Sequence, residues 1–295
     1  MKQIFSFSII AMILFSCAEE VKEDRREDEK ASELEMEAKK PLEDHKEKAY
    51  YPIPSPEQMF GFINDAGLSY SQSLMNPTKN YQDYINLTSQ ALNFGVYTAD
   101  LAYCAAYEDI ESTLDYYKVV KIMGTDMNIE EMMTEKMMEN MQAHLQNKDS
   151  LAIIAGDSYY QAVEFLESNG QVGKLALISL GGWIESIYIT INSINEFDPN
   201  SETANRLASQ KITFGNLYTY LKKHEEESGV VEELKAIQKV RSVFGSLIEK
   251  RTVSKENDAN LKMISNSKSK IEITKTQFQE LKLAVNNYRN SITKI

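Results

Sequence analysis

The sequence predicts an all-α fold, a single multi-helix domain of eight or nine helices with a short β-hairpin or mobile loop near 258–274. Turn-forming residues are scarce, because the 295 residues include only 12 Gly and 6 Pro, about half the combined share of an average globular protein. Apolar residues recur at intervals of three and four over most of the chain, which is the spacing of one helix face. Both observations argue against a β-rich, turn-rich fold.

Charge and composition exclude several classes of protein. The net charge of −12 leaves no basic surface for phosphate groups, so we expect no nucleic-acid partner. Three His and two Cys are too few for a Cys₄ or Cys₂His₂ zinc site or a disulfide scaffold. No cofactor is expected.

The N-terminal segment, residues 1–17, has the pattern of a secretory signal peptide. Lys2 precedes an apolar run from Ile4 to Phe15, which is shorter than the roughly twenty residues that span a bilayer as a helix. The run ends at Leu14-Phe15-Ser16-Cys17, which resembles a bacterial lipoprotein signal in which the cysteine receives the lipid. We therefore expect lipidation of Cys17, with a plain secreted protein as the alternative.

Residues 18–50 predict a disordered acidic tether. Positions 18–48 hold 13 acidic and 8 basic residues and few apolar ones, so the stretch buries too little surface to offset its ordering entropy. Ala18 replaces the aspartate that resembles an inner-membrane retention signal, and Glu19-Glu20 is similar to the acidic export patches of Bacteroidota lipoproteins. These features predict an outer-membrane lipoprotein, on the periplasmic side or at the cell surface.

The all-helical domain is expected to cover 51–295. Three alternating prolines in Tyr51-Pro52-Ile53-Pro54-Ser55-Pro56 enforce extended backbone and prevent a helix from continuing through. Ser55 is then a suitable N-cap, with Pro56 at the first helical position and Gln58 at the third.

Five apolar stripes illustrate the helical pattern of this domain. The first three are Tyr84, Leu87, Ala91 and Phe94; Ile110, Leu114, Tyr117 and Val120; and Leu151, Ile154, Ala162, Phe165 and Leu166. The other two are Val230, Leu234, Ile237, Phe244, Leu247 and Ile248; and Phe278, Leu281, Val285, Tyr288 and Ile292. Gly124 and Gly170 follow the second and third stripes, where a left-handed glycine ends many helices. Thr274 and Gln277 form a capping box before the last stripe.

A Lys-, Ser- and Asn-rich stretch at 251–273 departs from the helical pattern. Leu261, Met263, Ile271 and Ile273 alternate about a polar turn, which fits either a short β-hairpin or a mobile loop.

Two segments, 91–107 and 175–188, are apolar on all sides, as expected of central helices. Mid-helix glycine costs about 1 kcal/mol relative to alanine, so Gly95, Gly181 and Gly182 predict close helix crossings or a kink. A membrane span is the alternative for the second segment, but its Gly-Gly pair and Glu185 favour a soluble core helix.

The same two segments carry the candidate ligand-binding residues Tyr97, Asp100, Tyr103, Trp183, Glu185 and Tyr188. Asp100 precedes Tyr103 by three residues, and Glu185 precedes Tyr188 by three, so each carboxylate shares a helix face with a tyrosine. A pocket formed by these residues would bind a small ligand or act as an acid/base pair. The alternative is that both carboxylates are structural hydrogen-bonding groups. No catalytic residue is assigned.

A methionine-rich helix at 129–145 offers a weaker candidate site. Met133, Met137 and Met141 follow at four-residue steps, and His144 lies just beyond. Thioether and imidazole groups at this spacing suit Cu(I). An ordinary amphipathic helix with methionine as core filler accounts for the same pattern, so no metal site is assigned.

The strings ALNFGVYTADLAY and GGWIESIYI resemble those of a family of uncharacterised all-helical lipoproteins from Bacteroidota. The resemblance covers most of 52–295 and implies a helical fold and an envelope location. It implies no activity.

We therefore expect a membrane-anchored envelope lipoprotein that acts as a non-catalytic binding or interaction module with an envelope protein partner. One alternative is a small-ligand-binding protein or hydrolase that uses Asp100 and Glu185. Another is a purely structural envelope component, which would show an exposed apolar patch and a stable partner.

Overall fold

A computed structural model describes residues 67–129, 139, 143, 161–253 and 267–294. Contacts divide the chain into Met1–Tyr50 and Tyr51–Ile295, and every described residue belongs to the second unit. The predictions for the signal peptide, Cys17, the tether and the Ser55 N-cap lie outside the described residues. The same holds for Met133, Met137, Met141 and His144.

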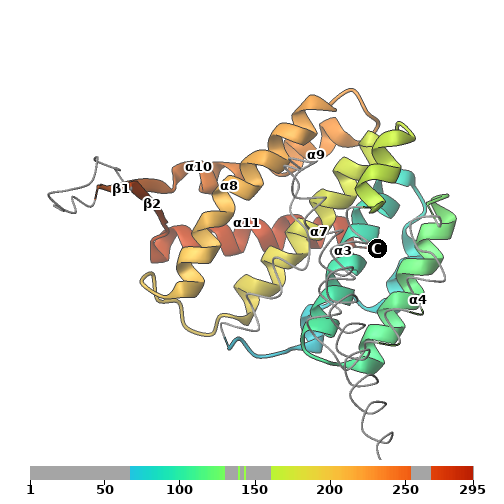
Figure 1. Ribbon diagram of the computed structural model, residues 1–295, viewed down its shortest axis with the longest axis horizontal. Coiled ribbons are helices and arrows are strands. Elements are labelled where there is room, and N and C mark those ends of the chain that lie inside the picture. Colours follow the sequence, from blue (N-terminus) through green and yellow to red (C-terminus); the bar gives the residue numbers. More distant parts are fainter. Residues whose placement is uncertain (1–66, 130–138, 140–142, 144–160, 254–266, 295) are drawn as a thin grey trace, which may run out of the picture. The chain divides into compact units, whose positions relative to one another are not determined.

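The all-α prediction is confirmed, with one short antiparallel sheet (Figure 1). Two 3₁₀ helices open the described chain, η1 (Gln72–Leu74) and η2 (Thr78–Asp83). The α-helices with described bounds are α3 (Leu87–Ala106), α4 (Ile110–Asp126), α7 (Val172–Ser193), α8 (Glu202–Lys223), α9 (Val230–Ala236), α10 (Gln238–Ser246) and α11 (Lys275–Thr293). Residues 161–168 are also helical.

Helices α3 and α7 form the centre of the domain. They pack on each other along most of their length, with α4 beside α3, and with α8 and α11 beside α7 (Figure 1). Most residues of α7 are buried. Among the described helices, α7 is long and apolar enough to cross a bilayer, and 83% of its most apolar stretch is buried inside the fold. This burial is the one expected of a core helix.

The predicted close crossing is confirmed at Gly95 and Gly181. A Cβ atom on Gly95 would lie 2.0 Å from the carbonyl oxygen of Ile178, and one on Gly181 would lie 1.9 Å from that of Leu92. Main chain therefore contacts main chain, and any side chain at these positions would push α3 and α7 apart.

Side-chain caps define several helix starts. Asn86, Asp109, Ser201 and Thr274 each accept a hydrogen bond from the backbone N–H three residues on, which satisfies one of the free donors of a first turn. The predicted capping box of Thr274 and Gln277 is confirmed.

One of the two predicted glycine helix ends is correct. Gly170 has φ +67° and follows the helical residues 161–168. Gly124 was predicted to end its helix but lies inside α4, which continues to Asp126 because Met123 and Gly124 are buried against the core. Asn128 instead takes the left-handed conformation, with φ 54°, which asparagine tolerates through local hydrogen bonds.

Two apolar stripes extend beyond the helices that form. Tyr84 precedes α3, and Leu87, its first residue, is 64% exposed. The stripe at 230–248 divides at Ile237 into α9 and α10, and Ile248 begins a strand with 65% of its surface exposed. Periodicity alone did not reveal these breaks, because helix caps and a change of backbone direction decide them.

A β-hairpin, one of the two alternatives predicted for 251–273, is confirmed. Strand β1 (Ile248–Val253) pairs antiparallel with β2 (Ser267–Glu272), in a register that places Ile248 opposite Glu272. The sheet starts three residues earlier than the predicted segment. Ile271 and Ile273 are buried at its base, while Leu261 and Met263 lie outside the described residues.

Candidate functional site

Three buried charged side chains meet at the centre of the domain. Asp100 of α3 and Glu185 of α7 are 0% exposed, and Arg289 of α11 is 8% exposed. The glycine crossing brings α3 and α7 close together. Arg289 lies on the buried face of α11, four residues after Val285 and three before Ile292, so α11 directs it inward.

Arg289 neutralises Glu185 through a bidentate ion pair. Its Nε donates to Glu185 Oε2 at 2.8 Å, and its Nη2 donates to Oε1 at 2.8 Å. The guanidinium also lies over the ring of Tyr188, 4.4 Å from the ring centre. Parallel hydrogen bonds and a cation–π contact are the geometry in which a buried arginine is best stabilised.

Asp100 is the carboxyl group with the more strongly raised pKa. Burial raises the pKa of Asp100 well above its usual value, the Glu185 carboxylate raises it further, and Arg289 opposes the change. Burial also raises the pKa of Glu185, but its ion pair with Arg289 lowers it. Asp100 Oδ1 meets no N–H or O–H donor among the described residues, and Glu185 lies within hydrogen-bonding distance. A proton on Asp100 would bond the two carboxyl groups and leave the three side chains with a net charge of zero.

The remaining polar groups of the centre bind the segment Leu68–Pro77, which precedes η2 and which we call the strap. Asp100 Oδ2 accepts a hydrogen bond from the Asn76 backbone N–H at 3.0 Å. The hydroxyl groups of Tyr116 and Tyr97 donate to the carbonyl oxygens of Asn76 and Pro77, both at 2.9 Å. Arg289 Nη2 donates to the Leu74 carbonyl at 3.5 Å. The centre thus recognises the main chain of the strap.

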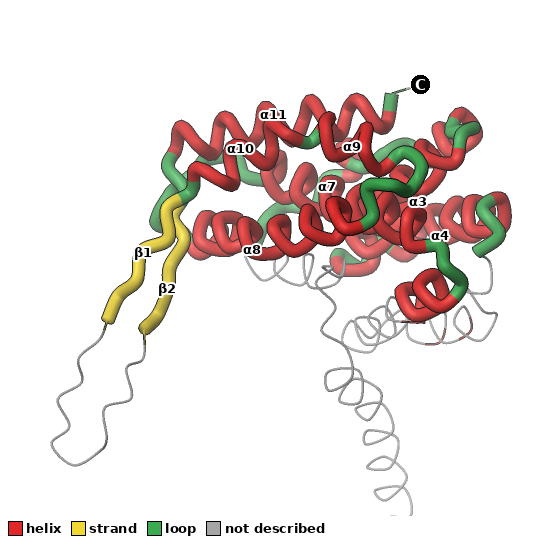
Figure 2. Tube along the Cα trace, turned by 90° about the horizontal axis from the view of Figure 1, so that it is seen from above, coloured by secondary structure: helices red, strands yellow, loops and turns green. Residues whose placement is uncertain are grey.

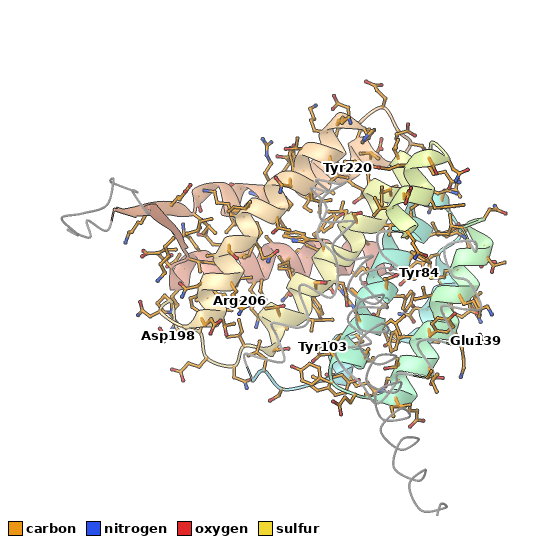
Figure 3. All side chains as sticks on the ribbon, viewed as in Figure 1. Tyr84, Tyr103, Glu139, Asp198, Arg206 and Tyr220 are labelled. Atoms are coloured by element: carbon orange, nitrogen blue, oxygen red, sulfur yellow. The ribbon has the colours of Figure 1, made fainter. Side chains whose placement is uncertain are left out.

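Tyrosines continue this contact along the strap. Tyr103 accepts from the Ser71 backbone N–H at 3.0 Å, and Tyr107 donates to the Leu68 carbonyl. The Tyr70 ring packs on both, with ring centres 5.1 Å and 5.3 Å apart. Near the other end of α3, Tyr84 accepts from the Asn76 side-chain amide and donates to the Thr293 carbonyl. Figure 3 shows Tyr84 and Tyr103 near opposite ends of α3.

The structure brings together most of the predicted ligand-binding residues, but not all. Asp100 and Glu185 lie side by side, Tyr188 covers Arg289, and Tyr97 and Tyr103 bind the strap. Trp183 lies apart. Its Nε1 donates to Gln210 at 3.3 Å, and its ring stacks on Phe214 with the ring centres 4.8 Å apart.

Arg289, Asn76 and Tyr116 were not among the residues predicted for this site. Arg289 had a signal in the sequence, because it shares the apolar face of Val285 and Ile292 and must therefore be buried with a partner. Asn76 had no comparable signal, since the strap lies outside the helical pattern.

Two surface hollows lie elsewhere in the described part of the chain. One, of about 710 Å³, is lined by Thr88 and by residues between Glu225 and Glu232. The other, of about 420 Å³, lies beside the last two turns of α11. Neither is lined by Asp100, Glu185 or Arg289. Over the described residues, no group of three His, Cys, Asp or Glu side chains is placed to hold a metal ion.

No protein-family model, curated protein or solved structure matches the chain. The resemblance to helical Bacteroidota lipoproteins therefore stays a prediction, based on two strings that lie mainly in α3 and α7.

Proposed function

We propose that the protein is a lipid-anchored lipoprotein of the bacterial outer membrane that acts as a non-catalytic binding module for another envelope protein. The anchor and the location are supported by the sequence of 1–50: an apolar leader ending at Cys17, followed by a charged tether that starts without an aspartate.

The burial and the hydrogen-bond partners of Asp100 and Glu185 support the proposal that the protein is not an enzyme. Asp100 and Glu185 are fully buried, one is paired with Arg289, and the other holds the backbone of Asn76. A general acid, base or nucleophile must reach its substrate within hydrogen-bonding distance. Here the protein's own strap occupies the space within hydrogen-bonding distance of Asp100. We therefore assign Asp100, Glu185 and Arg289 a role in stabilising the fold. A hydrolase or small-ligand site at these residues would require the strap to leave.

Lipidation is tested by growing cells that express the full chain with an alkyne-tagged fatty acid. We expect the label on the wild-type chain and its loss in Cys17→Ala, together with loss of the chain from the membrane fraction. Equal labelling of both chains, or an unlabelled wild-type chain that is secreted, would contradict the anchor.

The binding role is tested on the full chain in intact cells and after purification in a zwitterionic detergent. We expect cross-linking in cells to give one discrete complex with another protein, and native mass spectrometry to give the bare mass of the chain. A retained small molecule that is lost in Asp100→Asn/Glu185→Gln would instead establish the ligand-binding alternative.

A further inference from the structure

The β1–β2 ribbon differs from the rest of the domain in its position. Figure 2 shows the two strands extending away from the helices. The base is firmly held, because Leu247, Ile271 and Ile273 are buried and the Lys211 side chain donates to the Leu247 carbonyl. Beyond this base, Ile248 to Lys250 are exposed. The ribbon is therefore anchored at its base, and the first residues of β1 beyond the base are exposed.

The ribbon has strand edges that no third described strand covers. Its sheet has two strands in the described part of the chain, so each strand has one outer edge. Strand β2 packs against α8, and β1 lies on the side of the ribbon away from α8 (Figure 2). An isolated two-stranded ribbon is marginally stable in water, and an open edge of N–H and C=O groups readily pairs with a further strand.

The charge of the ribbon is opposite to that of the whole chain. The two strands contain Lys250, Arg251, Lys268 and Lys270 against Glu249 and Glu272, a net charge of +2 in a chain of −12. The rest of the sequence is therefore strongly acidic. An anionic membrane or a nucleic acid would be repelled by it, whereas a thin segment that contacts the ribbon alone is screened from charges more than about 8 Å away at physiological salt.

The strand register places two lysines opposite each other. Lys250 lies directly opposite Lys270. Like charges in directly opposed positions destabilise a sheet. Lys250 and Lys270 both interact with the single carboxylate of Glu272, which accepts from Lys250 at 2.7 Å. One carboxylate between two ammonium groups leaves the face that carries Lys250 and Lys270 positive and able to accept further acidic side chains.

We propose that the outer edge of β1 and the lysine face of the ribbon dock an acidic, extended polypeptide segment of an envelope partner as an added strand. Main-chain hydrogen bonds along β1 would hold the segment. Glutamate or aspartate at alternate positions would lie on the face of Lys250 and Lys270. This inference rests on the proposed function, because it names the surface and the chemistry of the partner of a binding module.

The test uses the full chain in zwitterionic detergent and a fluorescent octapeptide of alternating glutamate and valine. We expect saturable binding by fluorescence anisotropy, weakened about ten-fold or more in Lys250→Glu/Lys270→Glu. The matched control is Lys235→Glu/Lys239→Glu, which makes the same change in net charge on the exposed surface of α9 and α10 and should bind like the wild type. Circular dichroism checks that both variants keep the helical fold.

Two further probes separate strand addition from simple charge attraction. The same peptide with alternate backbone nitrogens methylated keeps its charge but cannot pair along an edge, so we expect it not to bind. Glycerol 3-phosphate, which has the anionic headgroup chemistry of phosphatidylglycerol without its acyl chains, should not displace the peptide. The inference is overturned by equal binding of the methylated peptide, by no binding of the parent peptide, or by displacement of the peptide by glycerol 3-phosphate.

The in-cell complex distinguishes failure of this inference from failure of the proposed function. If the cross-linked partner persists in Lys250→Glu/Lys270→Glu, the ribbon is not the docking surface, although the protein is still a binding module. Loss of the complex in this variant, but not in Lys235→Glu/Lys239→Glu, is the result we expect.

Discussion

The centre of the domain and the β1–β2 ribbon treat charge in opposite ways. At the centre, Asp100, Glu185 and Arg289 are buried, Arg289 pairs with Glu185, and the strap binds Asp100 and Arg289. On the ribbon, Lys250 and Lys270 are exposed and share one carboxylate. Buried charges must find their partners within the fold, since the alternative is an unpaired ion in a low dielectric. Exposed charges that outnumber their partners, such as two lysines beside one carboxylate, can bind a charged group of another molecule.

The same comparison holds for packing. At the α3–α7 crossing, backbone meets backbone at Gly95 and Gly181, whereas Gly215 in α8 and Gly245 in α10 have nothing within 4 Å of an added Cβ. Substitutions should therefore have large effects at the centre and small ones toward the ribbon. Four predictions test this difference, and each can be measured as the free energy of urea unfolding of the full chain in zwitterionic detergent.

The largest effect is expected for Arg289→Met, which leaves the Glu185 carboxylate buried without a cation. Removing one partner of a buried ion pair typically costs about 3–5 kcal/mol. The double variant Glu185→Met/Arg289→Met should recover much of this loss, because it removes both charges. A loss below about 1 kcal/mol in the single variant would show that Glu185 is stabilised by other groups.

Gly95→Ala and Gly181→Ala should each destabilise the domain by about 1–3 kcal/mol or more, since the new methyl group overlaps main chain of the facing helix. Gly215→Ala and Gly245→Ala are matched controls and should stabilise it by about 0.5–1 kcal/mol, the gain from replacing glycine in an open helix position. Similar effects at all four positions would contradict the close crossing.

The third prediction concerns pH. Because burial and Glu185 raise the pKa of Asp100 in the folded chain, the folded chain keeps a proton that the unfolded chain loses above about pH 4. Stability from this group is therefore fully present below that pH and falls as the pH rises toward the folded-state pKa. Each unit of pKa difference corresponds to about 1.4 kcal/mol.

Asp100→Asn replaces the acid by an amide that does not ionise, and it should remove this loss. Its stability relative to the wild type should thus increase between pH 4 and pH 8, with the exposed Asp83→Asn as control. If the difference between Asp100→Asn and the wild type does not change with pH, Asp100 is ionised in the folded protein.

The smallest effects are expected on the ribbon. Ile248→Thr and Lys270→Ser change exposed side chains and should alter the free energy of unfolding by no more than about 0.5 kcal/mol. Ile273→Thr, at the buried base of the ribbon, should cost more, because it places a hydroxyl group in the core. A large loss for Lys270→Ser would mean that the exposed part of the ribbon stabilises the fold.

Several features of the fold could be predicted from local pattern. The capping box at Thr274, the left-handed Gly170 and the glycine crossing of two apolar helices each depend on residue types within one or two turns. The hairpin was one of two alternatives, and the alternation of apolar residues fitted a mobile loop equally well. The continuation of α4 past Gly124 was missed, because burial by neighbouring helices outweighs the tendency of glycine to end a helix.

The candidate site was only partly predictable. The pairing of a carboxylate with a tyrosine on each central helix indicated that Asp100 and Glu185 are special and need donors. The identity of those donors depended on contacts between residues far apart in the chain. Asn76 and Arg289 are separated by more than two hundred positions, and both reach the same pair of carboxyl groups.

By itself, the sequence determined the helical class of the domain, its two apolar central helices and the need to satisfy two buried carboxyl groups, because periodicity and residue chemistry are local properties. The tertiary structure alone decided that Arg289 pairs with Glu185, that the strap donates a hydrogen bond to Asp100, and that Trp183 faces α8. It also decided that Lys250 lies opposite Lys270. These outcomes depend on how helices cross and strands register, and packing of the whole chain sets both.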